Sequence, residues 1–271
     1  MHLDSLRVED GCRMRGEAVT RLETFVDAAF AFAVTLLVVS FDAMPNSFAE
    51  LYEALRRLPA FLAGFAILAM FWSAHHRFSR RFGLEDTTVV VLSLALVAMT
   101  LFYVYPLRML MAAGLHFATG GWAPTELTVE TALENRLVWI IYGSGFALLA
   151  ALIAWLNLHA LRSADRLGLD AAERATARME IVIMSMLVGC AMLSMLLTAL
   201  VDEHIDWVEA LPGMAYGLLG LVIPLYAARA EKNVLKLAAS RYTESSAPIR
   251  SAPLETRPED IDATADDASR S

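Results

Sequence analysis

The feature that most constrains this chain is a series of long apolar segments separated by polar linkers. Each segment is about long enough to cross most of a hydrocarbon core of roughly 30 Å, at about 1.5 Å per helical residue. The overall composition, 57% apolar and 19% charged, is typical of a polytopic membrane protein and unusual for a soluble domain. We therefore predict an all-α membrane protein with six transmembrane helices, near residues 24–41, 58–74, 88–111, 137–158, 181–201 and 211–228.

The positions of Lys and Arg predict the orientation. Positive charges precede the first segment and follow the second, fourth and sixth, whereas the alternate linkers hold few. Because cytoplasmic linkers collect Lys and Arg, we expect both termini in the cytoplasm of a multi-pass protein of the inner (plasma) membrane. An odd number of spans would break this alternation.

Composition also divides the chain into three parts. Residues 1–16 form a polar N-terminal arm with no following apolar stretch of the signal-peptide kind. Residues 17–232 hold the six segments. Residues 233–271 turn to Ser, Pro, Asp and Glu, which predicts a disordered acidic cytoplasmic tail.

The first apolar segment carries polar residues. Asp27 within a span costs on the order of 3 kcal/mol, so such a carboxylate usually faces protein or water. Phe32, Thr35 and Val39 are spaced i, i+3, i+7 and share one helical face, which extends to Asp42. At about 100° per residue, Asp27 lies roughly 140° from Phe32. One face can thus line a narrow apolar path with a single hydroxyl, while Asp27 points into neighbouring helices. The alternative is an ordinary first helix with an Asp paired for structure.

Several other classes of function lack support in the sequence. We find no basic stripe with interleaved aromatics, so no nucleic-acid partner is expected. Cys12 and Cys190 are far apart, and the adjacent His75 and His76 project about 100° apart on a helix, so no metal site is predicted. No cofactor is predicted, and the absence of a nucleophile–base set argues against an enzyme.

Two motifs carry a resemblance to a known family. Residues 21–27 read Arg-x-x-x-Phe-x-Asp ahead of an apolar helix with a Thr, and residues 71–76 read Phe-Trp-x-x-His-His. The pair resembles the transmembrane protein 175 family, potassium channels of bacteria, archaea and animal endosomes and lysosomes. Val26 stands where the family has Ser, and Phe32 stands at the constriction, where Ile or Leu is usual.

The resemblance implies a role for each matching residue. The first helices of a homotetramer would line a central pore that passes potassium ions passively across the lipid bilayer. Phe32 and Val39 would form apolar pore layers, Thr35 a hydroxyl layer between them, and Asp42 would attract cations at the outer mouth. The residues that brace the pore helix against the second helix would be Arg21, Phe25, Asp27, Trp72, His75 and His76.

Two other hypotheses stay open at this point. Asp27 would be a protonatable coupling site in a proton-coupled secondary transporter, whereas it is a structural brace in a channel. A membrane enzyme or haem protein is the third hypothesis.

Overall fold

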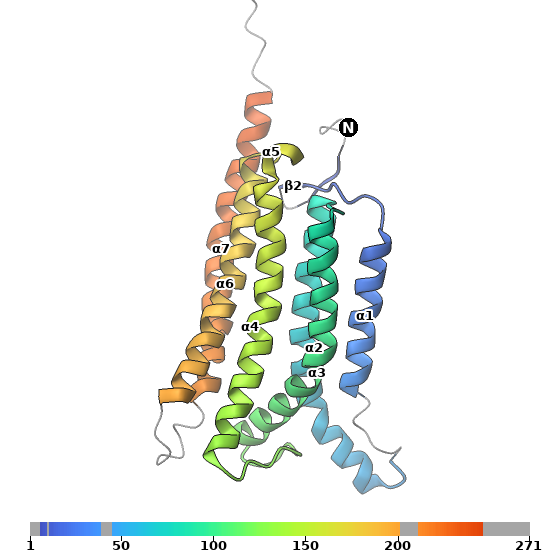
Figure 1. Cartoon of the computed structure of the whole chain (residues 1–271), viewed down its shortest axis with the longest axis vertical. Coiled ribbons are helices and arrows are strands. Elements are labelled where there is room, and N and C mark those ends of the chain that lie inside the picture. Colours follow the sequence, from blue (N-terminus) through green and yellow to red (C-terminus); the bar gives the residue numbers. More distant parts are fainter. Residues whose placement is uncertain (1–5, 10, 39–44, 201–210, 246–271) are drawn as a thin grey trace, which may run out of the picture.

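The computed structural model describes residues 6–9, 11–38, 45–200 and 211–245. Within these residues the chain forms a bundle of six long helices lying roughly side by side (Figure 1). They are α1 (Arg21–Val38), α2 (Phe48–Phe82), α3 (Thr87–Ala118), α4 (Ala132–Arg162), α6 (Ala171–Leu200) and α7 (Leu211–Ser245), and the short α5 (Ala164–Leu167) joins α4 to α6. The strands β1 (Val8–Glu9) and β2 (Cys12–Arg13) pair as an antiparallel hairpin.

The predicted apolar segments correspond to the long helices. Each of the six overlaps one of them, so the prediction of a helical chain is confirmed, with the hairpin as a small exception. By length and composition, four of the helices in the described part of the chain, α2, α3, α4 and α6, are suited to crossing a membrane. The full count of six spans and the side on which the termini lie stay predictions.

Local sequence explains where several helices begin and bend. Ser47 caps α2 by accepting the N–H of Glu50, and Thr131 caps α4 in the same way through Glu134. Pro59 and Pro106 lie inside α2 and α3, where the ring cannot donate to the helix ladder. Both helices bend in their lower parts (Figure 1), as expected for internal prolines.

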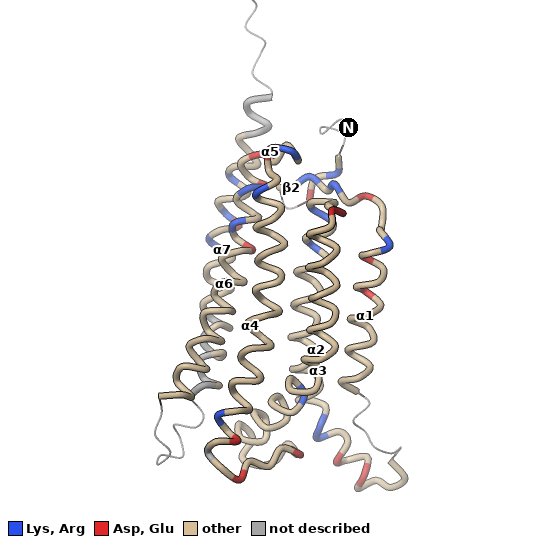
Figure 2. The backbone as a smooth tube through the Cα atoms, in the orientation of Figure 1, with Lys and Arg blue, Asp and Glu red and all other residues tan. Residues whose placement is uncertain are grey.

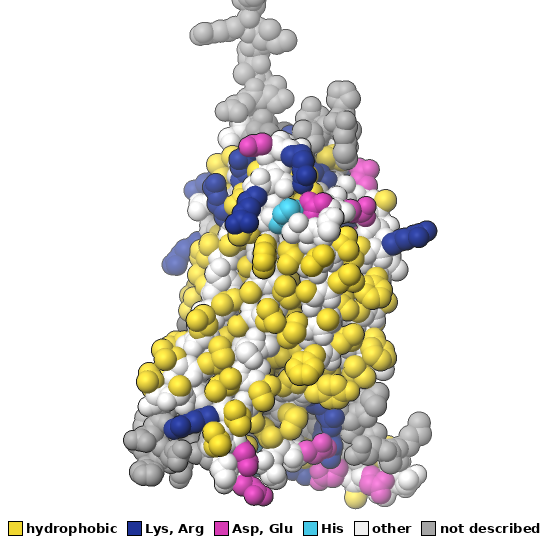
Figure 3. Space-filling model, in the orientation of Figure 1, with side chains coloured by type: hydrophobic (Ala, Val, Ile, Leu, Met, Phe, Trp, Pro, Cys, Tyr) yellow, Lys and Arg dark blue, Asp and Glu magenta, His cyan; other side chains and the backbone are white. Residues whose placement is uncertain are grey.

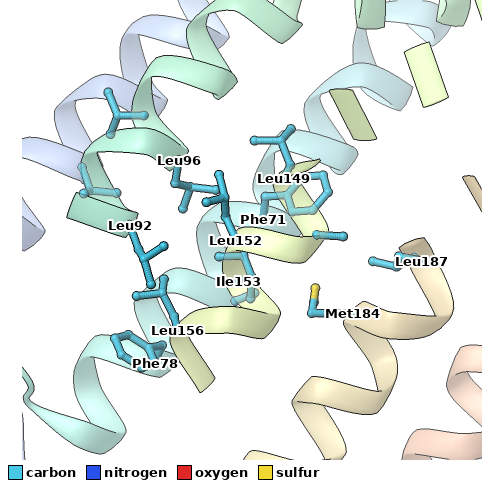
Figure 4. Close-up of a cluster of buried hydrophobic side chains, with 14 of the residues drawn as sticks. Phe71, Phe78, Leu92, Leu96, Leu149, Leu152, Ile153, Leu156, Met184 and Leu187 are labelled. Carbon is cyan, nitrogen blue, oxygen red and sulfur yellow. The ribbon is translucent and has the colours of Figure 1, made fainter. Parts of the chain in front are cut away.

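The core lies where α2, α3, α4 and α6 meet. Leu149 and Ile153 of α4 are fully buried between Phe71 of α2, Leu96 of α3 and Met184 of α6 (Figure 4). The outer surface of the bundle is also apolar, and a broad hydrophobic band crosses the face shown in Figure 3 between two charged ends. A band of this kind matches a lipid environment, since soluble monomers rarely expose such an area.

The arm and the tail differ from the divisions expected from composition. The hairpin is packed onto the bundle, with Leu6, Cys12 and Met14 buried. At the other end of the sequence α7 continues to Ser245, past the boundary expected near residue 232, and buries Val234 and Ala238. Both terminal segments therefore add structure to the same end of the bundle (Figure 1).

Candidate functional site: the exposed face of the first helix

Helix α1 has a buried side and an exposed side. Val26, Phe30, Ala33 and Leu37 are buried against the bundle, at the i, i+4, i+7, i+11 spacing of one helical face. Helix α1 lies at the edge of the bundle, beside α2 and α3 and far from α6 and α7 (Figure 1). Its other side is therefore available to a neighbouring molecule or to lipid.

The exposed side contains two of the predicted pore residues. Phe32 is 55% exposed and Thr35 is exposed one turn further along, so this part of the predicted face is accessible. The Thr35 Oγ1 donates its hydrogen to the carbonyl of Ala31 at 3.1 Å. This leaves the hydroxyl oxygen with its lone pairs directed away from the helix. Val39 and Asp42, the other two predicted residues, lie outside the described residues.

Asp27 points toward α2 and away from Phe32, as the helical spacing predicts. The indole Nε1 of Trp72 on α2 donates to Asp27 Oδ1 at 2.8 Å. His75, one turn further along α2, is buried, and its Nε2 lies 3.0 Å from the Oγ of Ser93 on α3. These two hydrogen bonds connect α1 to α2 and α2 to α3.

A further residue of this brace was missed from the sequence. Glu23 is 4% exposed, and its Oε1 lies 3.3 Å from His76 Nδ1. The His76 ring stacks on Trp72 with a centroid distance of 5.4 Å, so the two carboxylates of α1 lie beside two rings that pack on each other. Glu23 precedes Asp27 by four residues and so lies on the same face, a spacing that identifies it in retrospect.

The other two motif residues lie elsewhere on α1. Arg21 and Phe25 are exposed, and Phe25 projects about 200° away from Asp27 around the helix. Of the three motif residues on α1, Asp27 is the one that bonds Trp72. A bracing role for Arg21 and Phe25 stays a prediction.

The hairpin end of the bundle is held by buried carboxylates. Glu180 of α6 is 5% exposed and lies 3.0 Å from Arg77 Nε and 3.1 Å from Arg81 Nη1, both on α2. Glu180 therefore joins α6 to the end of α2 through both arginines, of which Arg81 is the more buried.

Asp86, which caps α3, has its charge stabilised in place. Burial alone raises the pKa of Asp86, but hydrogen bonds from His159 and the Val89 N–H, with the charge of His159 and a bond from Arg166, outweigh it. The pKa of Asp86 therefore lies below its usual 3.8. His159 Nε2 lies 2.7 Å from Asp86 Oδ2, which ties α4 to the start of α3.

Comparison with known proteins supports the two motifs. The family model "Endosomal/lysosomal potassium channel TMEM175" matches residues 21–104. A potassium channel of Marivirga tractuosa is 29% identical over 189 residues, which span 68% of this chain and 76% of the relative. The resemblance to the TMEM175 family is confirmed.

Solved structures extend the likeness beyond the matched segment. The potassium channel MtTMEM175, solved as a variant in complex with a Nanobody-MBP fusion protein, is 25% identical with a TM-score of 0.70. That similarity covers 83% of this chain and 99% of the other. A lysosomal potassium-selective channel TMEM175 homolog from Chamaesiphon minutus, 20% identical with a TM-score of 0.50 over 78% of this chain and 96% of that one, shares the fold.

The TMEM175 match coincides with the brace. Residues 21–104 contain every side chain that joins α1 to α2 and α2 to α3 in the contacts above, namely Glu23, Asp27, Trp72, His75, His76 and Ser93. Helices α4, α6 and α7 lie beyond the family model and share the TMEM175 fold through the structural comparison. Among the described residues, no three His, Cys, Asp or Glu side chains are grouped as a metal site requires.

Proposed function

We propose that this chain is one subunit of a homotetrameric potassium channel in the inner (plasma) membrane. Six helices cross the membrane with both termini in the cytoplasm, and α1 of each subunit lines a central pore that passes potassium ions passively. The TMEM175 likeness and the potassium channels among the relatives support the ion, and the homotetramer is the assembly that the family resemblance implies. The apolar band of Figure 3 supports the membrane location.

The observation that carries this proposal is the two-sided character of α1. One side is fixed to α2 by the Trp72–Asp27 hydrogen bond and by buried aliphatic contacts. The other side presents Phe32 and Thr35 outward from the edge of the bundle. A helix held rigidly from behind, with a narrow polar and apolar stripe in front, suits packing around a shared axis.

The chemistry of that stripe suits a cation pathway. Four copies of Phe32 would form an apolar constriction, and apolar constrictions gate by dewetting. Four Thr35 hydroxyl oxygens, whose hydrogens are donated to Ala31, would replace part of a cation's hydration shell. In the same proposal Val39 forms a second apolar layer and Asp42 concentrates cations at the outer mouth.

Ion flux from liposomes containing the purified protein tests the proposal, with potassium, sodium and protons compared. Phe32→Ala should increase flux by widening the constriction, and Thr35→Ala should lower the preference for potassium over sodium. Phe102→Ala on α3 and Ser144→Ala on α4 are matched controls, because both side chains are exposed and the Ser144 hydroxyl also bonds within its helix. If all four variants behave alike, α1 does not line the pore.

The structure also bears on the transporter hypothesis, because Asp27 is engaged by Trp72. Asn at this position keeps an oxygen acceptor for the indole but cannot carry a proton. We expect Asp27→Asn to keep passive potassium flux within about a factor of five, since a change of about 1 kcal/mol in a barrier alters a rate roughly fivefold. A different result would establish a carrier: the wild type shows no passive potassium flux but takes up potassium against its gradient when protons drive it, and Asp27→Asn abolishes that uptake.

A further inference from the structure

The hairpin end of the bundle carries a group of exposed cations on α4, α6 and α7. In Figure 2, Lys and Arg cluster on these helices at this end, and in Figure 3 their side chains gather directly above the apolar band. The five exposed residues, which we call the basic surface, are Arg162, Arg178, Arg229, Lys232 and Lys236.

The carboxylates nearby are already bound by other cations. Glu180 is occupied by Arg77 and Arg81, and Glu173 by Arg15. Asp165 is bound by Arg174 and Asp86 by Arg166. Within the described part of the chain, the residues of the basic surface form neither hydrogen bonds nor ion pairs through their side chains. One exposed carboxylate, Glu231, shares their stretch of α7, so the surface remains strongly positive.

Helix α7 presents its three cations as a stripe. Arg229, Lys232 and Lys236 are spaced i, i+3, i+7 and extend over about 10 Å of the helix. The opposite face of α7 is fixed, because Val234 and Ala238 are buried with Ala172 of α6. The stripe is thus held outward by packing on its other side.

At the opposite end of the bundle, three arginines are bound by other groups of the protein. Arg57 and Arg108 both bind Glu126, and Arg56 donates to the carbonyl of Trp122 at 2.6 Å. These arginines fasten the α3–α4 connection to the bundle. Among the described residues, the exposed cations without a bound partner therefore lie at the hairpin end.

We propose that the basic surface binds the headgroups of anionic phospholipids in the adjoining leaflet. The cations stand where the apolar band ends, so a lipid with its chains against the band places its phosphate beside them. The surface lies on the side of the bundle away from α1 (Figure 1), which makes it the periphery of the assembly. This last step rests on the proposed pore role of α1.

The test uses the purified full chain in detergent, titrated with dioctanoyl phosphatidylglycerol while its thermal unfolding midpoint is followed. We expect phosphatidylglycerol to raise the midpoint and dioctanoyl phosphatidylcholine to leave it unchanged. Soluble glycerol phosphate should have no effect, which separates a lipid from a free phosphate. The triple variant Arg229→Gln, Lys232→Gln, Lys236→Gln should need at least tenfold more phosphatidylglycerol for the same rise, since each cation contributes roughly fivefold.

The matched control removes the same number of charges from the opposite end, as Arg56→Gln, Arg57→Gln, Arg108→Gln. It should keep the wild-type response to phosphatidylglycerol, and single variants at Arg229 and Lys236 replace the triple variant if that one does not fold. An unchanged response in the basic-surface variants, or an equal response to phosphatidylcholine, overturns the proposal. Because the readout involves no conduction, a failed pore assignment would leave the lipid response in place, and a failed lipid response would leave potassium flux in place.

Discussion

At the scale of single residues, a close approach between α3 and α4 depends on a missing side chain. Gly145 of α4 faces the ring of Tyr103 on α3, and a Cβ added there would lie 2.4 Å from Tyr103 Cδ2. Tyr103 is 1% exposed and cannot rotate away without disturbing the core. The helices can pack this closely because position 145 has no Cβ.

Gly145→Ala is therefore expected to destabilise the protein by about 1–3 kcal/mol, as overpacking does. Gly189→Ala on α6 is the matched control, because an added Cβ there meets no atom within 4 Å. That variant should be neutral or slightly stabilising through the better helix propensity of Ala. Thermal unfolding in detergent measures both, and equal midpoints would contradict the packing argument.

At this scale the sequence predicts a side chain's position well when the prediction depends on the spacing within one helix. The spacing of Asp27, Phe32 and Thr35 predicts a braced side and an exposed side of α1. In the structure Asp27 bonds Trp72, and Phe32 and Thr35 are exposed. The partners of a carboxylate are harder to predict from the sequence, because Glu180 binds arginines about a hundred positions away along the chain. Periodicity within α2 cannot reveal that Arg77 and Arg81 bind a carboxylate of α6.

At the scale of elements, the N-terminal hairpin acts as a strap on α6. Glu173, 1% exposed, accepts the backbone N–H of Arg13 at 2.9 Å and lies 2.9 and 3.0 Å from the two terminal nitrogens of Arg15. The Gly16 N–H donates to the Arg80 carbonyl, which attaches the strap to the end of α2. Composition presents this segment as a free polar arm because its arginines are visible in the sequence and their distant acceptor is not.

Removing one side of that buried pair should be costly. We expect Arg15→Gln to lower stability by about 3–5 kcal/mol, because it leaves the Glu173 carboxylate buried and undercompensated. Arg7→Gln is the control, since the Arg7 side chain is 78% exposed beside Glu9 and such pairs contribute about 0–1 kcal/mol. If the two variants unfold at the same temperature, the strap does not stabilise the bundle.

The Asp86 cap predicts a specific pH dependence. Because the pKa of Asp86 is lower in the folded chain than in the unfolded chain, its stabilisation is present above about 3.8 and is lost as pH falls through the folded value. Asp86→Asn keeps the cap geometry but not the charge, and we expect it to cost about 1 kcal/mol at pH 7. The difference in unfolding midpoint from the wild type should persist at pH 5 and shrink below pH 3.8. A difference already lost at pH 5 would contradict the assignment.

At the scale of the whole molecule, apolar length predicts the helices and fails to predict their extent. Each expected segment corresponds to one long helix, yet α2 begins at Phe48 and α7 continues to Ser245, well beyond the apolar residues. Helix ends depend on caps such as Ser47 and on tertiary contacts such as Val234 against Ala172. A cap depends on one side chain and a tertiary contact depends on a residue far away in the sequence, so an average of hydropathy over a segment reveals neither.

The arrangement of subunits can be tested by cross-linking. If α1 helices meet around one axis, cysteines at position 32 approach one another in the assembly and cysteines on the periphery do not. Phe32→Cys should give dimers and higher species with a short bismaleimide, whereas Trp155→Cys, on an exposed face of α4, should stay monomeric on denaturing gels. The native Cys12 and Cys190 are buried, so the wild type provides the background. Cross-linking through position 155 and not 32 would place α4 at the axis, and the exposed stripe on α1 would then face lipid.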